Sequence, residues 1–306
     1  MTTNIIDPHL HFFALKHGDY HWLKSENPPF WPDKSKIQRD FSINDLSVSC
    51  AAEQENPVAI SLSGLVHIEA GFDNEKPTRE IEYIESLAVK RLATIAAINL
   101  LAPSLRFKKT LHSLVRFSSC VGVRHIFDEK AFELLSSQNV QSNFSELNKE
   151  ADFIFELQLP LAEKASLKVI PLLSKTIAQN SQLRFIINHA GFPPKCRQSK
   201  QWQLWQENIK TLAQHDNVYI KCSGMEMVNR QYQMSWFNDI AQCCLTHFTA
   251  HRVMLASNFP LCLFTKANYS EFWQDILTCD FLKQLEQTEQ DALLYQNALQ
   301  IYFSGH

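Results

Sequence analysis

Eight short apolar segments recur along the whole chain, separated by stretches of helical character, and this alternation constrains the fold more than any other feature. The segments are nearly continuous in apolar residues, which is typical of strands that are buried on both faces of a parallel sheet. The expected strands cover residues 4–12, 59–70, 93–100, 120–127, 152–159, 183–191, 217–224 and 251–259.

Helices are expected in the connections, at 78–90, 104–117, 160–179, 202–214 and 271–285, with only a short one at 143–150 after the fourth strand. Two more are expected at 41–53, with Ser42 as N-cap, and at 288–303, with Thr288 as N-cap. Eight buried strands joined by helices predict an α/β fold, a (β/α)8 TIM barrel, with a doubly wound open sheet as the competitor. A barrel of this size accommodates residues 1–306 as one domain.

The composition excludes several kinds of partner. Hydrophobic residues make up 45% and charged residues 20% of the chain, a globular balance. A net charge of -3 without a dense basic block argues against nucleic acid, and no apolar run approaches the ~20 residues that span a bilayer. We therefore expect a cytoplasmic protein with no nucleic-acid or membrane partner, whose cysteines are reduced.

Polar side chains gather at the carboxyl ends of the expected strands, where a barrel builds its active site. They are His9, His11, Glu69, Arg124, His125, Glu156, Gln158, Asn188, His189, Lys221, Ser223 and Asn258. His9 and His11 are two residues apart on a strand and so face the same side. Together with His189 they could bind a divalent metal ion or a substrate carbonyl; the alternative for each is a structural role.

Two carboxylates interrupt apolar runs, Glu69 and Glu156, which is costly unless each is paired. Each is expected to be a ligand, a base or an ion-pair partner of Arg124. Arg124 itself suits a substrate carboxylate or an oxyanion, with a structural bridge to Glu156 as the alternative. Lys221 lies one residue inside a strand end, and we expect it to point to the helix layer and to be structural.

The segment 16–56 is rich in aromatic residues and proline, and it is expected to form a long loop that covers the barrel mouth. Trp22 lies in this loop, where it either lines a pocket or only packs. Trp22 and His125 complete the residues expected to contact substrate.

Eight motifs in register resemble a known family. They are DPHLHF followed by YHWL, VHIEA, GVRH, FELQL, INHAGFP, NVYIKCSGM, RVMLASNFP and NALQIY, and they extend from Asp7 to Tyr302. These motifs are similar to the lactone-hydrolysing branch of the amidohydrolase superfamily, the amidohydrolase 2 type that includes fuconolactonases and pyrone-dicarboxylate lactonases. The resemblance implies a (β/α)8 barrel that hydrolyses the ester of a sugar-acid lactone, such as L-fuconolactone or L-rhamnonolactone, or of a pyrone dicarboxylate. A small-molecule lactone or sugar acid is then the expected partner, and self-association into a homo-oligomer stays open.

The resemblance also implies roles for individual residues. His9, His11 and His189 match histidines that polarise the lactone carbonyl, in some relatives with a bound zinc or manganese ion and in lactonases of this branch also without one. The carboxylate that activates water, in the family pattern Ser-Asp-Trp/Phe-Pro, is replaced here by Asn258. Because that carboxylate is absent, we expect no firmly bound metal.

Asn258 puts the usual mechanism in question, because an amide does not accept a proton at neutral pH and loss of a general base costs ~10²–10⁴ in rate. Asn258 could still orient a water for weak turnover, or Glu69, Glu156 or His189 could act as the base. A deliberate replacement of an aspartate at position 258 by asparagine would also give this sequence.

Two other functions are compatible with the motifs. One is a non-catalytic descendant that binds a lactone or sugar acid, and a weaker one is a zinc-dependent decarboxylase of the same superfamily. Phe192 stands where the family pattern has a basic residue, which indicates a less anionic or differently oriented ligand.

Overall fold

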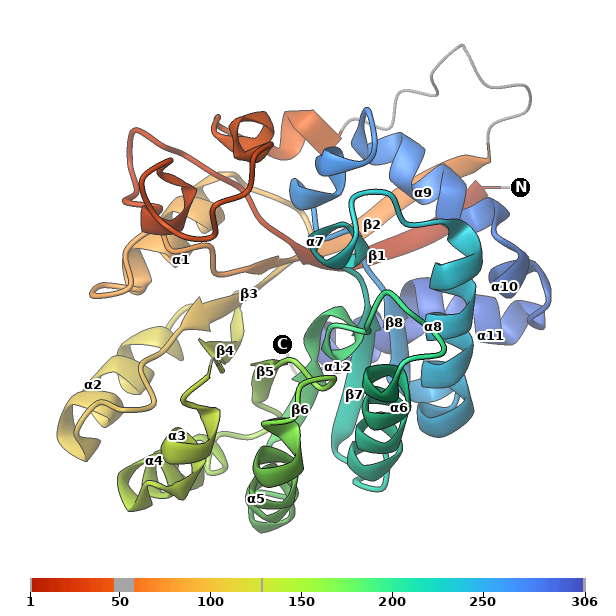
Figure 1. The fold of residues 1–306 in the computed structure, drawn as a ribbon. Helices are drawn as coiled ribbons and strands as arrows, with labels where there is room; N and C mark the ends of the chain where they lie inside the picture. The colour runs from red at the N-terminus through yellow and green to blue at the C-terminus, as the bar shows by residue number, and fades with distance from the viewer. Residues whose placement is uncertain (1, 47–57, 128, 305–306) are drawn as a thin grey trace.

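Eight parallel strands form one sheet in the order β1 to β8, and the chain winds around it once (Figure 1). The computed structural model describes residues 2–46, 58–127 and 129–304. The strands are β1 (Thr2–Leu10), β2 (Ala59–Ile68), β3 (Leu92–Ala97), β4 (Cys120–Ile126), β5 (Ile154–Gln158), β6 (Arg184–Ile187), β7 (Val218–Cys222) and β8 (Val253–Leu255). Every expected strand is present, and the fold is the predicted (β/α)8 TIM barrel.

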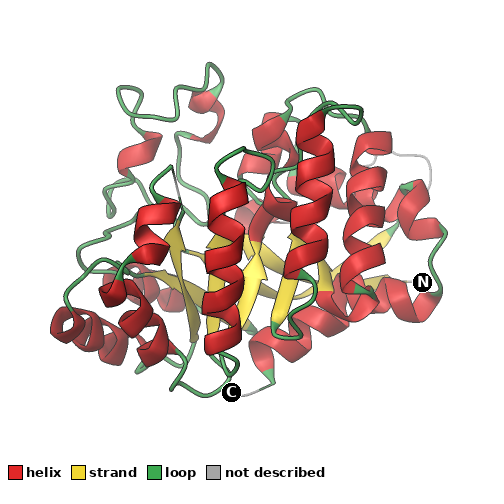
Figure 2. Ribbon diagram, turned by 60° about the horizontal axis from the view of Figure 1, so that its bottom comes forward, coloured by secondary structure: helices red, strands yellow, loops and turns green. Residues whose placement is uncertain are grey.

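Helices surround the strands on the outside (Figure 2). The α-helices are α1 (Thr78–Ser86), α2 (Ser104–Leu114), α3 (Ala131–Ser136), α4 (Gln138–Leu147), α5 (Ser166–Gln179), α6 (Lys200–Leu212), α7 (Met225–Val228), α8 (Met234–Phe248), α9 (Tyr269–Thr278), α10 (Asp280–Lys283), α11 (Gln287–Asp291) and α12 (Asn297–Phe303). Short 3-10 helices are η1 (His21–Leu23), η2 (Lys34–Ile37), η3 (Ile43–Leu46), η4 (Asn188–Gly191), η5 (Ala250–Arg252) and η6 (Leu261–Phe264), and the π-helical segment η7 (Ala292–Gln296) joins α11 to α12.

Three expected helices differ in detail. The connection after β4 holds two helices, α3 and α4, because a second apolar face upstream of residue 143 buries Leu134 and Leu135. The N-cap of α11 is Glu286, which forms a capping box with Glu289, so the prediction for Thr288 was wrong. Of the helix expected at 41–53, η3 is observed and residues 47–53 lie outside the described part.

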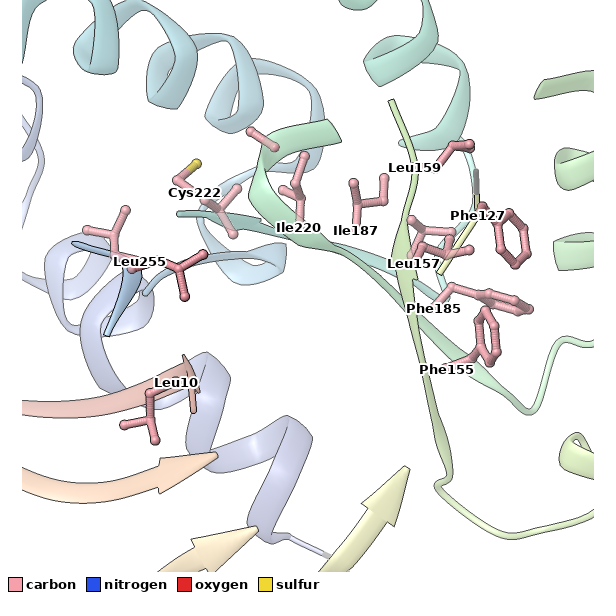
Figure 3. Close-up of a cluster of buried hydrophobic side chains, with 14 of the residues drawn as sticks. Leu10, Phe127, Phe155, Leu157, Leu159, Phe185, Ile187, Ile220, Cys222 and Leu255 are labelled. Carbon is pink, nitrogen blue, oxygen red and sulfur yellow. The ribbon is translucent and has the colours of Figure 1, made fainter. Parts of the chain in front are cut away.

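The hydrophobic core has two layers. The larger one lies between strands and helices, where Figure 3 shows Phe155, Phe185 and Leu157 packed together, and Phe144 of α4 meets Phe155 with ring centroids 4.9 Å apart. The smaller layer contains inward-facing strand residues together with Tyr302 and its neighbours on α12. The polar side chains of the candidate site lie beyond these apolar layers, at the carboxyl ends of the strands.

Backbone hydrogen bonds close the barrel between the end of β1 and the segment after β8. The Asn258 amide donates to the His9 carbonyl at 2.9 Å, and the His11 amide donates to the Phe259 carbonyl at 2.7 Å. Barrel closure therefore brings His9 of β1 and His11, directly after it, next to Asn258.

The excursion between β1 and β2 includes η1, η2 and η3. It is held by the buried Lys34 ammonium, which donates to the carbonyls of Trp22 at 2.9 Å, Lys24 at 3.0 Å and Asn27 at 2.7 Å. All three ammonium N–H groups thus have an acceptor, which fixes residues 22–34 of this excursion. Across the described ranges, no helix has the length and apolar composition needed to cross a membrane.

Candidate active site

A cavity of about 790 Å³ opens at the carboxyl ends of the strands. Its wall includes nine residues singled out from the sequence: His11, Trp22, Glu69, Arg124, His125, Gln158, His189, Phe192 and Asn258. The first-loop residues His21 and Trp31 also line it, so the excursion after β1 forms part of the wall. His9 and Glu156 do not contribute to the lining.

Three histidines form a cluster at the cavity floor. The His9 ring centroid lies 5.1 Å from that of His11 and 4.6 Å from that of His189. All three are buried, and burial is the largest cause that lowers their pKa values well below the usual range. Nearby positive charge lowers them further, from Lys221 at His9 and from Arg124 at His11 and His189. The three imidazoles are therefore neutral at pH 7.

The tautomer of His11 follows from its backbone contact. Its Nδ1 lies 2.7 Å from the Ile68 carbonyl, which only accepts, so Nδ1 carries the proton and Nε2 carries a lone pair. His189 Nδ1 lies 3.0 Å from Ser223 Oγ. Neither ring nitrogen of His9 has a protein partner, although both are buried. The cluster therefore offers unpaired hydrogen-bonding atoms beside the cavity.

The backbone around His189 is held in an unusual conformation. From His189 to Phe192 every residue has positive φ, between 48° and 66°. Non-glycine residues rarely adopt such angles, and runs of them mark sites where surrounding structure imposes the geometry. Gly224 packs against this ring, since a Cβ there would lie 2.4 Å from His189 Nδ1. A side chain at position 224 would displace His189.

Asn258 follows β8 and is itself in the left-handed region, with φ of 55°. Its Nδ2 donates to Glu226 Oε1 at 2.6 Å, while its Oδ1 is buried without a protein partner. Glu226 lies on α7 and was not singled out from the sequence. Burial raises its pKa to about 7, against the lowering effect of the Asn258 hydrogen bond.

Each of the three guanidinium nitrogens of Arg124 donates one hydrogen bond to a neighbour on the cavity wall. Its Nε donates to Glu69 Oε1 at 2.7 Å, its Nη2 to the Glu69 carbonyl at 2.6 Å, and its Nη1 to Gln158 Oε1 at 3.0 Å. The ion pair expected as one alternative for Glu69 is thus formed. On the rim, Arg106 pairs with Glu75 at 2.6 Å.

Glu156 lies inside the barrel, away from the cavity wall, and its partner is Lys221 at 2.6 Å. The expectation that Lys221 points to the helix layer was wrong. β7 alternates so that Tyr219 packs with the inner core, and Lys221, two residues on, faces the same way. The bridge from Arg124 to Glu156 that was the alternative role of Arg124 is not formed, because each residue has another partner.

A second buried carboxylate missed from the sequence is Asp7 of β1. It accepts hydrogen bonds from the Ser257 hydroxyl and, at 3.0 Å, from Tyr269, and burial raises its pKa to about 6. Asp7 therefore ties β1 to the segment that carries Asn258. Its position at the start of the DPHLHF motif was the only available sequence signal.

The three imidazoles were the expected ligands of a divalent cation. Their neutral nitrogens, above all the two unpartnered ones of His9, have the chemistry that zinc binds. However, the strand-eight position supplies an amide, and within the described residues no group of three or more His, Cys, Asp or Glu is arranged to hold a metal ion. As arranged, the site does not fit a metal ion, and the absence of a firmly bound metal stays a prediction.

The chain is similar to known proteins in sequence and in fold. The model of a family described as Amidohydrolase matches residues 6–303. The uncharacterized protein y4mH of Sinorhizobium fredii is 24% identical, covering 97% of this chain and 98% of that protein.

Two solved structures share the fold. An amidohydrolase from Burkholderia multivorans, solved with bound HEPES and with bound zinc, has 18% identity and a TM-score of 0.77, with 98% of this chain and 99% of that chain covered. A probable 2-pyrone-4,6-dicarboxylic acid hydrolase from Acinetobacter baumannii, with citric acid bound, has 17% identity and a TM-score of 0.68, with the same coverage.

Proposed function

This chain belongs to the amidohydrolase family, which confirms the resemblance to the superfamily, and from that premise we propose that it hydrolyses the ester bond of a neutral sugar-acid lactone such as L-fuconolactone or L-rhamnonolactone. The observation that carries the proposal is a set of neutral imidazoles and an unpaired amide oxygen at the floor of a cavity whose charges are already paired. That the substrate is a lactone, and a neutral sugar-acid lactone in particular, is part of this proposal.

The charges around the cavity favour an uncharged ligand. The charged residues in the described lining are Glu69, Glu75, Arg106 and Arg124, and they form two ion pairs. A dicarboxylate would need a cation that is free to receive it, because an unpaired anion in a buried site is costly. A polyhydroxylated lactone instead needs donors and acceptors, together with aromatic faces such as Trp22 and Trp31.

In this proposal a water adds to the lactone carbonyl carbon, the ring carbon–oxygen bond breaks, and the ring oxygen receives a proton, which yields a hydroxy acid. His11 Nε2 carries a lone pair, Asn258 Oδ1 has no protein partner, and both residues line the cavity, so the two atoms are suited to accept hydrogen bonds from that water. His189 is the candidate donor to the carbonyl oxygen. His9 packs against both rings and supports their positions.

Binding without turnover is the second candidate, and two observations favour it. The residue at the end of β8 is an amide with no proton-accepting power at neutral pH, and the depressed pKa of His11 makes that imidazole a weak base. Turnover is therefore expected to be slow. Decarboxylation, the third candidate, is separated from both by the release of carbon dioxide.

The test is a pH-indicator assay of aldonolactones with the wild-type protein, with His11→Ala and with His251→Ala, whose histidine is exposed before β8. We expect acid release that His11→Ala abolishes and His251→Ala preserves. Calorimetric binding of an aldonolactone without acid release would instead support the binding function. Neither turnover nor binding across the panel would contradict both.

A further inference from the structure

Glu226 is a buried carboxylate that the proposed chemistry does not use. It lies on α7, directly after β7, and only 1% of it is exposed. Its neighbour Met227 lines the cavity, whereas Glu226 does not. It stands behind the wall, on the far side of Asn258. A buried carboxylate is costly, so its partner needs explanation.

That partner is the Asn258 carboxamide. Asn258 Nδ2 donates to Glu226 Oε1 at 2.6 Å, and both side chains are buried. Because Glu226 Oε1 is the acceptor of this hydrogen bond, the amide is oriented with Nδ2 toward Glu226 and Oδ1 away from it. Oδ1 is left buried and without a protein partner, on a residue that lines the cavity.

Backbone conformation alone does not explain this pairing. Asn258 has φ of 55°, which favours glycine, asparagine or aspartate. Its backbone amide is already fixed by the His9 carbonyl. These constraints select a small residue at position 258, but they do not place a carboxylate against its side chain.

We propose that Glu226 is a positioning residue that holds the Asn258 carboxamide with Oδ1 toward the cavity, where Oδ1 accepts a hydrogen bond from the attacking water or from a ligand hydroxyl. The Glu226 carboxylate does not line the cavity itself and acts on the site through the Asn258 amide. The identity of the group that donates to Asn258 Oδ1 rests on the proposed function. The orientation of the amide rests only on the hydrogen bond from Asn258 Nδ2 to Glu226 Oε1.

The pairing has a consequence for any carboxylate introduced at position 258. Asn258→Asp replaces a donor by an acceptor at 2.6 Å from Glu226 Oε1, and two carboxylates at that distance share one proton. The single variant therefore gives a poor base at neutral pH. Adding Glu226→Gln supplies an amide donor to the new carboxylate and frees it to ionise.

The kinetic test compares five variants with the wild type on the lactone that is turned over. Glu226→Leu is expected to lower kcat by ~10-fold or more with KM within ~3-fold, while Glu226→Gln keeps the acceptor and stays within ~3-fold of wild type. Asn258→Asp with Glu226→Gln is expected to exceed Asn258→Asp alone by ~10-fold at pH 7, with its pH profile displaced to lower pH. Asn297→Ala, which loses hydrogen bonds to the Ala250 and Val253 carbonyls, is the control for a buried amide and keeps kcat.

A second readout needs no turnover. Selective ¹⁵N-asparagine labelling gives a side-chain NH₂ signal for Asn258, assigned by its loss in Asn258→Asp. We expect this signal to be shifted and slow to exchange in the wild type and Glu226→Gln, and to lose both properties in Glu226→Leu. An unchanged signal in Glu226→Leu, or equal activity of the single and double aspartate variants, would overturn the positioning role. Absence of any lactone turnover with the expected signals would contradict the proposed function alone.

Discussion

Lys221 Nζ lies 2.6 Å from Glu156 Oε1 and 2.8 Å from Oε2, and neither side chain is exposed to solvent. The hydroxyl of Tyr302 adds a hydrogen bond to Oε1 at 2.7 Å. The pair therefore joins β5 and β7 to the C-terminal helix in the barrel interior. The Lys221 ammonium also lowers the pKa of His9 in the candidate site.

Removing one partner of this pair is expected to be strongly destabilising. Lys221→Met or Glu156→Leu leaves a buried charge uncompensated, which costs about 3–5 kcal/mol in the free energy of unfolding. The double variant Lys221→Met with Glu156→Leu removes both charges and is expected to be more stable than either single variant. Urea denaturation followed by circular dichroism measures all three. Additive losses in the double variant would show that the two charges do not depend on each other.

Glu69 is expected to decide which ligands the cavity accepts. Its carboxylate neutralises Arg124 through a contact of 2.7 Å, so Glu69→Gln leaves the guanidinium with its charge uncompensated. We expect this variant to bind anions such as aldonates or dicarboxylates ~10-fold more tightly and neutral lactones no better. Competition calorimetry with an aldonate and its lactone measures the ratio. Glu146→Gln is the control, because its partners Lys108 and Lys149 lie outside the cavity lining and a surface ion pair contributes little.

The strands and the histidine cluster could be predicted because both follow from periodicity. Continuous apolar runs located every strand, and the i, i+2 spacing of His9 and His11 fixed their common side. The ends of the strands were predicted less accurately, because the polar residues there belong to turns. His189, for example, was assigned to a strand, but it lies in η4 with positive φ.

Partners inside the barrel could not be predicted from the same pattern. Arg124 and Glu156 are register partners on neighbouring strands, yet Arg124 binds Glu69, directly after β2, and Glu156 binds Lys221 of β7. Which carboxylate pairs with a given cation depends on how far along the barrel axis the two side chains lie. Glu226 was missed for a different reason: α7 has four residues, too few to show a helical period.

A dialysed preparation is expected to contain much less than one equivalent of zinc or manganese. His9, His11 and His189 supply nitrogen donors, but Asn258 contributes an amide where a carboxylate would add negative charge and a strong oxygen ligand. Elemental analysis by mass spectrometry after dialysis measures the content. A stoichiometric metal that survives dialysis would contradict this prediction, and Asn258→Asp with Glu226→Gln is the matched variant in which retention should rise.

The stability of the protein is expected to fall as the pH rises from 6.5 to 8, and Glu80 is the main cause. Burial, followed by the charge of Glu69, raises the pKa of Glu80 to about 8, so the folded protein keeps a proton that the unfolded chain has already lost. Each increase in pH then favours unfolding until Glu80 ionises in the folded state, which amounts to roughly 1–2 kcal/mol over this window. The buried histidines have lowered pKa values, so their contribution to stability rises with pH only up to about 6.5, where the unfolded imidazoles lose their protons, and is constant above it. They therefore do not offset the fall. Urea titrations at several pH values measure it, and Glu80→Gln should flatten the curve; an equal slope in wild type and variant would rule Glu80 out as the cause.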